Sequence, residues 1–203
     1  MRALVVATTN PDKVREIREI LAGLPITLQT LSDFAAVVPP AETGTTFHEN
    51  ARQKALFYAR ATRALVVAED SGLEVDALGG APGVQSARFG GEDATYAEKF
   101  ALLYEALHQV DAVTSTARFV CALAVANPDA VVFEARGTVE GSIAPEPRGH
   151  GGFGYDPIFF YPPFGCTLAE AGERKNEVSH RARAFRALRG RLEAHVTTAR
   201  ATS

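Results

Sequence analysis

Hydrophobic and polar positions along the chain follow two different periods, and this predicts an α/β protein. Short apolar runs bounded by turn residues are typical of buried strands. Such runs occupy residues 3–7, 26–30, 64–68, 117–126, 131–139 and 158–160. The two longest runs are separated by Asn127-Pro128-Asp129, which favours an antiparallel hairpin.

Apolar residues recur at helical spacing in four other segments, and capping residues mark where these begin. Asn10 followed by Pro11 is typical of a helix N-terminus. Capping-box patterns occur at Thr46 with Glu49 and at Thr95 with Glu98. Helices are therefore expected at 11–23, 46–62, 95–108 and 179–193, and residues 167–177 are expected to be partly helical.

The elements together predict one α/β unit with a mixed sheet. A chain of 203 residues is long enough for a single domain with a well-buried core. No linker or low-complexity segment interrupts it. We expect one domain spanning residues 1–203, with an ordered core of about 1–193 and a frayed tail after it.

Composition and charge narrow the class of partner. The net charge of −3 gives no general drive toward nucleic acid or an anionic membrane. No apolar run approaches membrane-spanning length, and no signal-peptide pattern appears. The two cysteines, Cys121 and Cys166, form neither a disulfide framework nor a CxxC pair. A soluble, cytoplasmic protein without nucleic-acid or membrane partners is expected.

A lysine near the start of the first helix points to an anion site. Helix N-termini carry partial positive charge, so Lys13 is unfavourable there unless an anion binds. Thr8, Thr9 and Asn10 add side-chain donors in the loop before it. The alternative is that Lys13 simply points into solvent. The chain has only four lysines against seventeen arginines, which slightly favours a specific role.

Acidic residues follow the apolar run at 64–68 and are candidates for catalysis. Adjacent side chains on a strand face opposite ways, so of Glu69 and Asp70 one can face a site while the other braces it from behind. Glu42 is a third candidate acid. Carboxylate oxygens suit Mg²⁺, which usually keeps water and substrate phosphate as further ligands. Ordinary solvated acids are the alternative reading.

Three further groups are candidate ligand contacts. Lys54 shares a side of its helix with Asn50 and can extend toward a cleft. The stretch from Phe153 through Gly154 and Tyr155 to Asp156 holds two aromatic rings among glycines, and Phe153 could stack on a base. Cations crowd the start of the last helix, which again indicates a local basic cleft for a polyphosphate: Lys175, His180 and Arg181.

Five motifs in this order resemble the non-canonical purine nucleoside triphosphate pyrophosphatases, the inosine/xanthosine triphosphate pyrophosphatase family. The motifs are ATTNPDKVREI (7–17), ETGTTFHENARQKA (42–55), AEDSGLEVDALGGAPGVQSARF (68–89), GGFGYDPIF (151–159) and ERKNEVSHRARA (173–184). Each is modest alone, but together they span nearly the full chain.

The resemblance implies a fold, a reaction and a set of partners. The fold would be an elongated α/β protein with a long central mixed sheet flanked by helices and two lobes around an active-site cleft. The enzyme would hydrolyse ITP, dITP and XTP to the monophosphate and pyrophosphate with Mg²⁺, cleansing the nucleotide pool, and would be a homodimer.

The resemblance also implies roles for individual residues. The segment from Thr8 to Lys13 matches the family's phosphate-binding segment, and Glu42 and Asp70 match its metal-associated acids. Asp70 matches the proposed general base, with Lys13, Lys54 and Glu69 completing the catalytic candidates. The remaining matches are substrate contacts: Ser71, Phe153, Gly154, Tyr155, Asp156, Lys175, His180 and Arg181. Glu69 stands where many members carry aspartate, and Ala41 stands where some members have a second acid. These departures leave the metal ligand set open, and Glu42 in particular.

Other function classes fit parts of the pattern. A non-catalytic purine nucleotide sensor would use the same phosphate loop but needs no acidic cluster. A house-cleaning pyrophosphatase for modified pyrimidine nucleotides would differ in its substrate profile. An RNA-binding module is disfavoured by the acidic balance and by the lack of basic strands with interleaved aromatics.

Overall fold

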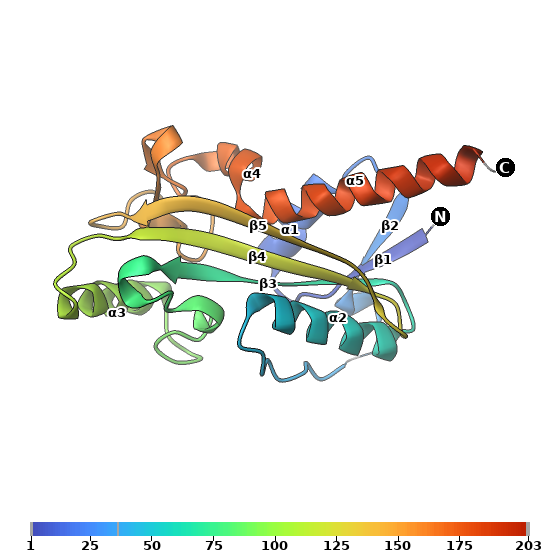
Figure 1. The fold of residues 1–203 in the computed structure, drawn as a ribbon, viewed down its shortest axis with the longest axis horizontal. Helices are drawn as coiled ribbons and strands as arrows, with labels where there is room; N and C mark the ends of the chain where they lie inside the picture. The colour runs from blue at the N-terminus through green and yellow to red at the C-terminus, as the bar shows by residue number, and fades with distance from the viewer. Residues whose placement is uncertain (1, 36, 202–203) are drawn as a thin grey trace. The chain divides into compact units, whose positions relative to one another are not determined.

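The computed structural model describes the backbone of residues 2–35 and 37–201. Within these residues the strands form one sheet in the order β2-β1-β3-β4-β5-β6-β7 (Figure 1). The strands are β1 Arg2–Val6, β2 Ile26–Thr30, β3 Val66–Val75, β4 Thr116–Ala126, β5 Val131–Ile143, β6 Phe159–Tyr161 and β7 Cys166–Thr167. β1 pairs in parallel with β2 and β3, whereas β6 pairs antiparallel with β5 and β7. The predicted mixed sheet is confirmed.

The helices begin where their capping residues predict. They are α1 Pro11–Ile20, α2 Phe47–Thr62, α3 Tyr96–Gln109, α4 Lys175–Val178 and α5 His180–Ala201. The Asn10 side chain accepts hydrogen bonds from the amides of Asp12 and Lys13, and both predicted capping boxes form. These side chains satisfy amides that the first helical turn leaves without partners.

The two largest differences from the predicted boundaries are in α5 and β3. The last helix was expected to end near 193, but α5 continues to Ala201. Once a helix has formed, each further residue costs little free energy to add. The apolar spacing ends at Leu192 and therefore does not indicate how far the helix continues. Of the expected tail, residues 202–203 lie outside the described part of the chain.

β3 is the second difference. The strand expected at 64–68 runs instead from Val66 to Val75, so Glu69, Asp70 and Ser71 lie within the strand and not after its end. Acids normally interrupt a buried strand because burial of a charge is costly. Both carboxylates here have cationic partners inside the protein, which the local sequence pattern does not contain.

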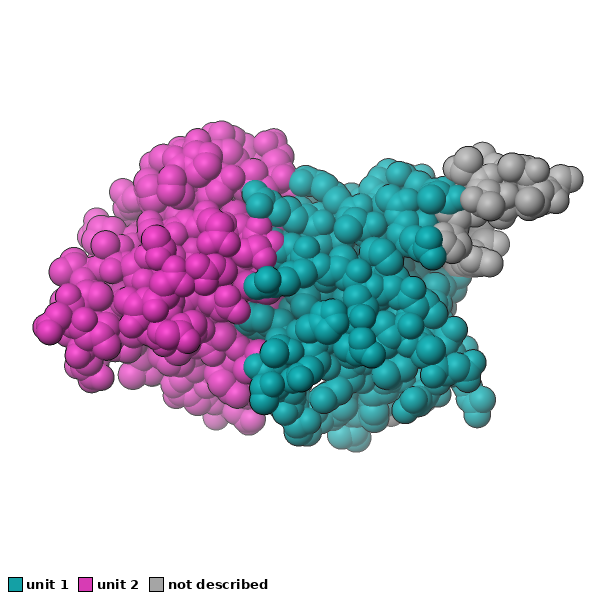
Figure 2. All heavy atoms as spheres, viewed as in Figure 1, with its two compact units in different colours: residues 1–70, 121–137, 180–203 teal, residues 71–120, 138–179 magenta. Residues whose placement is uncertain are grey.

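The chain divides into two compact units (Figure 2). The first comprises residues 1–70, 121–137 and 180–203, and the second comprises residues 71–120 and 138–179. Each unit has its own apolar core. The core of the first includes Leu4, Ile17, Val67, Leu123 and Phe185, and that of the second includes Leu73, Leu103, Phe119, Ile158 and Phe159. The single domain and the two-lobed arrangement around a cleft stay predictions.

In the first unit, α1 packs against α5 (Figure 1). Ile17 of α1 and Phe185 of α5 are both fully buried in the same core. Arg189 of α5 donates to the carbonyls of Ile20 and Ala22 at 2.9 and 2.7 Å. These are carbonyls at the C-terminal end of α1, where a cation is favourable. The contact attaches the C-terminal end of α1 to α5.

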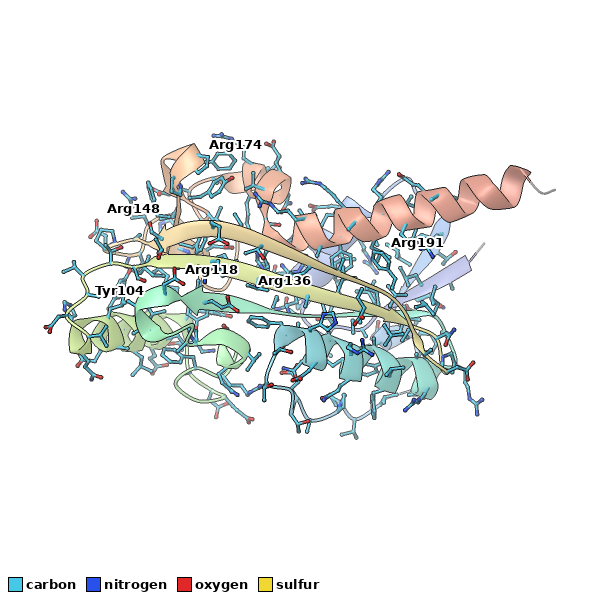
Figure 3. All side chains as sticks on the ribbon, in the orientation of Figure 1. Tyr104, Arg118, Arg136, Arg148, Arg174 and Arg191 are labelled. Carbon is cyan, nitrogen blue, oxygen red and sulfur yellow. The ribbon has the colours of Figure 1, made fainter. Side chains whose placement is uncertain are left out.

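In the second unit, charged side chains connect neighbouring strands. Arg118, labelled in Figure 3, lies on β4 and donates from Nε to Glu140 of β5 at 3.0 Å. Its Nη1 is 2.8 Å from Asp76, which follows β3. Hydrogen bonds from Arg118 and Thr116 lower the pKa of Asp76. Such solvent-facing pairs add little stability, so the apolar core holds this unit together.

Candidate active site

The loop from Thr8 to Lys13 follows β1 and opens α1. The Thr8 hydroxyl oxygen accepts from the amide of Asn10 at 3.2 Å, and the Asn10 oxygen accepts from the amide of Lys13 at 3.2 Å. Thr9 is exposed. The Lys13 side chain keeps 20% of its surface exposed. The loop is therefore shaped by its own hydrogen bonds and presents a cation beside a positive helix end, as predicted.

Glu69 is the internal counter-ion of Lys13. Its Oε1 lies 3.3 Å from Lys13 Nζ and 2.9 Å from Arg181 Nε, and its Oε2 accepts from the Cys121 thiol at 3.2 Å. The hypothesis that only a bound phosphate offsets the placement of Lys13 was therefore incomplete, since a carboxylate of the protein does so as well. The counter-ion comes from a distant strand, which is why the local pattern showed a conflict.

The pKa values of this buried group follow from its contacts. Burial by itself raises the pKa of Glu69, but the charges of Arg181 and Lys13 outweigh it and hold the pKa well below its usual range. Burial and the neighbouring Glu69 charge raise the pKa of the Cys121 thiol. Cys121 therefore stays a protonated donor. The prediction that Cys121 belongs to the core is confirmed, and the structure adds this polar contact.

Asp70 points to a different set of partners, as alternation along a strand requires. Its Oδ2 accepts from Asn50 Nδ2 at 2.9 Å, and its Oδ1 lies 3.2 Å from Lys54 Nζ. The same Lys54 Nζ lies 2.8 Å from Glu42 Oε1. The structure thus brings together Glu42, Lys54 and Asp70, three of the predicted site residues from three separate segments.

The environment of Asp70 suits proton transfer. Burial raises the pKa of Asp70, and the Glu42 charge adds to this, while Lys54 and the Asn50 hydrogen bond offset part of the effect. For Lys54, burial lowers the pKa, but the charges of Asp70 and Glu42 and the hydrogen bond to Glu42 outweigh it, so the pKa is raised. A carboxylate with a raised pKa beside a permanent cation is a candidate general base.

Glu42 and Asp70 are the two carboxylates in this cluster that could hold a divalent metal ion together with a bound phosphate. Their oxygens already share one cationic group, the Lys54 ammonium, at 2.8 and 3.2 Å. Within the described residues, no cluster of three or more His, Cys, Asp or Glu side chains could hold a metal. Two carboxylates are the usual protein contribution to a Mg²⁺ site that also uses water and phosphate oxygens.

Asn50 is a site residue that the sequence prediction did not include. Its side chain is 1% exposed, donates to Asp70 and accepts from the amide of Gly44 at 2.8 Å. A Cβ on Gly44 would lie 2.6 Å from the Asn50 oxygen, so this approach requires glycine. Asn50 therefore ties the loop carrying Glu42 to the acid on β3. The available signal was a polar residue among the inward positions of α2, one turn before Lys54.

Asn50→Ala is expected to lower kcat about tenfold or more, because Asp70 loses the donor that fixes one of its two oxygens. Removal of a buried hydrogen-bond partner is also expected to cost about 1–3 kcal/mol of stability. Steady-state pyrophosphate release from dITP, the reaction that the family resemblance implies, and thermal unfolding measure the two effects. Asn127→Ala, in the turn between β4 and β5, is the matched control; equal kcat values for both variants would contradict the assignment.

In the second unit, the predicted base-binding stretch is held by one buried ion pair. Lys175 Nζ lies 2.7 Å from Asp156 Oδ2, and the same oxygen accepts from the Phe153 amide at 2.7 Å. The Lys175 ammonium also lies over the Phe153 ring, 4.3 Å from its centre. Gly152 has a φ of +68° and a Cβ there would collide with Asp156, so only glycine fits. The predicted site residues Phe153, Asp156 and Lys175 thus form one cluster, with Gly152 as its neighbour.

Tyr155 faces inward from this stretch. Its ring is buried and its hydroxyl donates to the carbonyl of Ser86 at 3.0 Å. The Tyr96 ring meets it edge-on at 5.4 Å. A Cβ at Gly154 would lie 3.6 Å from the Tyr96 hydroxyl. Ser71, the predicted substrate contact on β3, is half-buried. The Tyr155 side chain therefore supports the loop, while Phe153 is only partly buried.

His180 and Arg181 open α5 and are both buried. Arg181 is 1% exposed, and its guanidinium contacts Glu69 at 2.9 Å and Glu16 at 2.7 Å. A Cβ on Gly137 of β5 would collide with the His180 carbonyl. The predicted substrate contact of Arg181 stays a prediction, and the structure places its guanidinium between two acids of the protein. Of these, Glu16 is a second residue that the sequence prediction did not include. No helix in the described part of the chain is long and apolar enough to cross a membrane.

Comparison with known proteins identifies the family of this chain. Residues 4–191 match the model of the Ham1 family. A dITP/XTP pyrophosphatase of Thermus thermophilus is 51% identical over 193 residues, covering 95% of this chain and 91% of that protein. One of Geobacillus kaustophilus is 49% identical over 186 residues, covering 91% of each. The solved structure of a HAM1 protein from Coxiella burnetii has a TM-score of 0.89 and 40% identity, covering 96% of this chain and all of that one. The chain belongs to the Ham1 family.

Proposed function

We propose that this chain hydrolyses non-canonical purine nucleoside triphosphates, dITP, ITP and XTP, to the monophosphate and pyrophosphate. The observation that carries the proposal is the buried Asp70 carboxylate, held between Asn50 and Lys54 beside Glu42. The naming of relatives as dITP/XTP pyrophosphatases supports the substrate class. A non-catalytic nucleotide sensor would have no need of this arrangement.

Asp70 is the general base in this proposal. Its raised pKa and its fixed oxygens favour taking a proton from a water that attacks the α-phosphorus. Lys54, held next to Asp70, neutralises negative charge that develops on the phosphate. Lys13, at the positively polarised start of α1, binds the departing pyrophosphate.

Glu42 and Asp70 would hold Mg²⁺ through one or two carboxylate oxygens. When bound, the ion would polarise phosphate oxygens and neutralise developing charge. Glu69 is placed differently, because its oxygens already bind Arg181, Lys13 and Cys121. Its role in catalysis is therefore to hold Lys13, which supports reading it as the bracing acid.

The base would be bound by the cluster around Asp156. Phe153 offers a partly buried ring for stacking, and Lys175 and Asp156 fix the loop that carries it. A 6-keto purine accepts a hydrogen bond where adenine would donate one, so a donor at that position penalises ATP. His180, Arg181 and nearby backbone N–H groups are the candidate donors.

We extend the proposal to a cytoplasmic homodimer that binds neither nucleic acid nor membrane. Family membership is the support for the dimer, and the net charge of −3 is the support for the absence of nucleic-acid binding.

Release of pyrophosphate and orthophosphate from ITP, dITP, XTP, ATP, GTP and dTTP, with and without Mg²⁺, tests the function. Mg²⁺-dependent pyrophosphate from the first three, with ATP nearly inert, is expected. Orthophosphate release would mean that the α-phosphorus is not attacked. Turnover of dTTP alone would favour a pyrimidine house-cleaning enzyme, and binding without any release would favour the sensor.

A further inference from the structure

Four charged side chains of the first unit alternate in sign along a continuous line of contacts. The order is Glu16, Arg181, Glu69 and Lys13, with separations of 2.7, 2.9 and 3.3 Å. Glu16, Arg181 and Glu69 are all buried. Burial of charges at this density is costly unless each is paired, and here the line ends at the half-buried lysine of the phosphate loop.

The geometry couples Lys13 to Arg181. Both cations contact the same oxygen, Glu69 Oε1, at 3.3 and 2.9 Å. If Arg181 moved closer to that oxygen, it would compete with Lys13 for it. Glu16 holds the other end of the guanidinium through Nη1 and so limits that movement. The position of the Lys13 ammonium therefore depends on the Glu16 carboxylate, through Arg181 and Glu69.

We propose that Glu16 is a positioning residue for the reaction, acting through Arg181 and Glu69 to place the Lys13 ammonium against the phosphates. This rests on the proposed function, in which Lys13 binds the departing pyrophosphate. Glu16 itself is buried on α1 and contacts no substrate in this assignment.

A purely structural role for Glu16 in attaching α1 to α5 is less able to explain the arrangement. That attachment has other contacts, namely the apolar packing of Ile17 with Phe185 and the two hydrogen bonds of Arg189. Glu16 and Lys13 also lie on the same helix, one turn apart, so the helix already fixes their backbones relative to each other. The contacts from Glu16 through Arg181 and Glu69 to Lys13, here called the charge line, add control of the Lys13 side chain.

The test compares Glu16→Ala, Glu16→Gln and Arg189→Met, measured as kcat and KM for pyrophosphate release from dITP with Mg²⁺. Glu16→Ala is expected to lower kcat about tenfold with KM changed less, because the interaction serves the transition state. The amide of Glu16→Gln can still accept from Arg181, so kcat is expected within about threefold of wild type. Arg189→Met is expected to lower the melting temperature while kcat is retained.

A double-mutant cycle gives the readout that a structural role would not move. Lys13→Met removes the group through which Glu16 acts, so Glu16→Ala is expected to have no further effect on kcat in that background. An unchanged kcat for folded Glu16→Ala, or the same loss with and without Lys13, would overturn the inference. If Glu16→Ala does not fold, Glu16→Asp, whose carboxylate is withdrawn by one methylene, carries the same cycle.

A second measurement separates this inference from the proposed function. The rate at which an acetylating reagent modifies the Lys13 amine, followed by peptide mass spectrometry, needs no substrate. Glu16→Ala is expected to raise that rate at least about threefold relative to Arg189→Met, because Glu69 holds the amine less tightly. An unchanged rate overturns the inference that Glu16 positions Lys13. A wild-type enzyme that releases no pyrophosphate overturns only the proposed function.

Discussion

Asp70→Asn is expected to lower kcat for dITP by about 10³-fold, because the amide cannot take a proton from the attacking water. Nucleotide binding is expected to stay largely intact, since the phosphate loop and the Asp156 cluster are unchanged. Kcat from pyrophosphate release and a dissociation constant for the monophosphate product measure the two quantities. Near-normal turnover would exclude Asp70 as the base.

Folding of this variant has to be checked for a specific reason. Asn50 Nδ2 and Lys54 Nζ both donate toward Asp70, one to each oxygen. Either orientation of a new amide places its NH₂ against one of these donors, at a cost of about 1–3 kcal/mol. Asp76→Asn, at an exposed carboxylate beside Arg118, is the control for loss of an ion pair away from Asp70.

Lys54→Met is expected to lower kcat/KM by about 10²-fold or more and to change how the protein responds to Mg²⁺. The ammonium group now contacts both Glu42 and Asp70, so its removal leaves two like charges with no shared cation. Without nucleotide, Mg²⁺ is therefore expected to raise the melting temperature of the variant more than that of wild type, because ligand binding stabilises the folded state.

Glu42→Gln added to Lys54→Met is the control for this effect. The double variant keeps Asp70 but loses the second carboxylate, so the extra Mg²⁺ stabilisation is expected to disappear. Equal responses of wild type and both variants to Mg²⁺ would place the metal elsewhere. Sodium chloride added to the same ionic strength separates site binding from general screening of surface charge.

Local signals in the sequence predicted most of the elements and the grouping of several site residues. Asn10, Thr46 and Thr95 cap the helices that they were expected to cap. Adjacent acids on one strand were expected to have different surroundings, and Glu69 and Asp70 do. These predictions held because they depend on residues only a few positions apart. For such residues the backbone geometry of a helix or strand sets the direction in which each side chain points.

The sequence predictions failed where the partner of a charged or polar side chain lies far away along the chain. β3 continues past Val67 because Lys13, Arg181 and Lys54 compensate its acids, and none of these lies near it in sequence. Asn50 looked like an ordinary position on the side of a helix until the loop at Gly44 and the acid on β3 were placed next to it.

The sequence by itself determined the fold class, the helix starts and the family, because capping, periodicity and motif order can be read along the chain. Anion binding by the loop before α1 and the chemical roles of the acids stay predictions. Only the tertiary structure decided which cation neutralises which acid. Glu69 pairs with Lys13 and Arg181, whereas Asp70 pairs with Lys54 and Asn50. These pairings depend on packing between α1, α2, β3 and α5, since a charge in the interior is stable only where the fold brings its partner within contact.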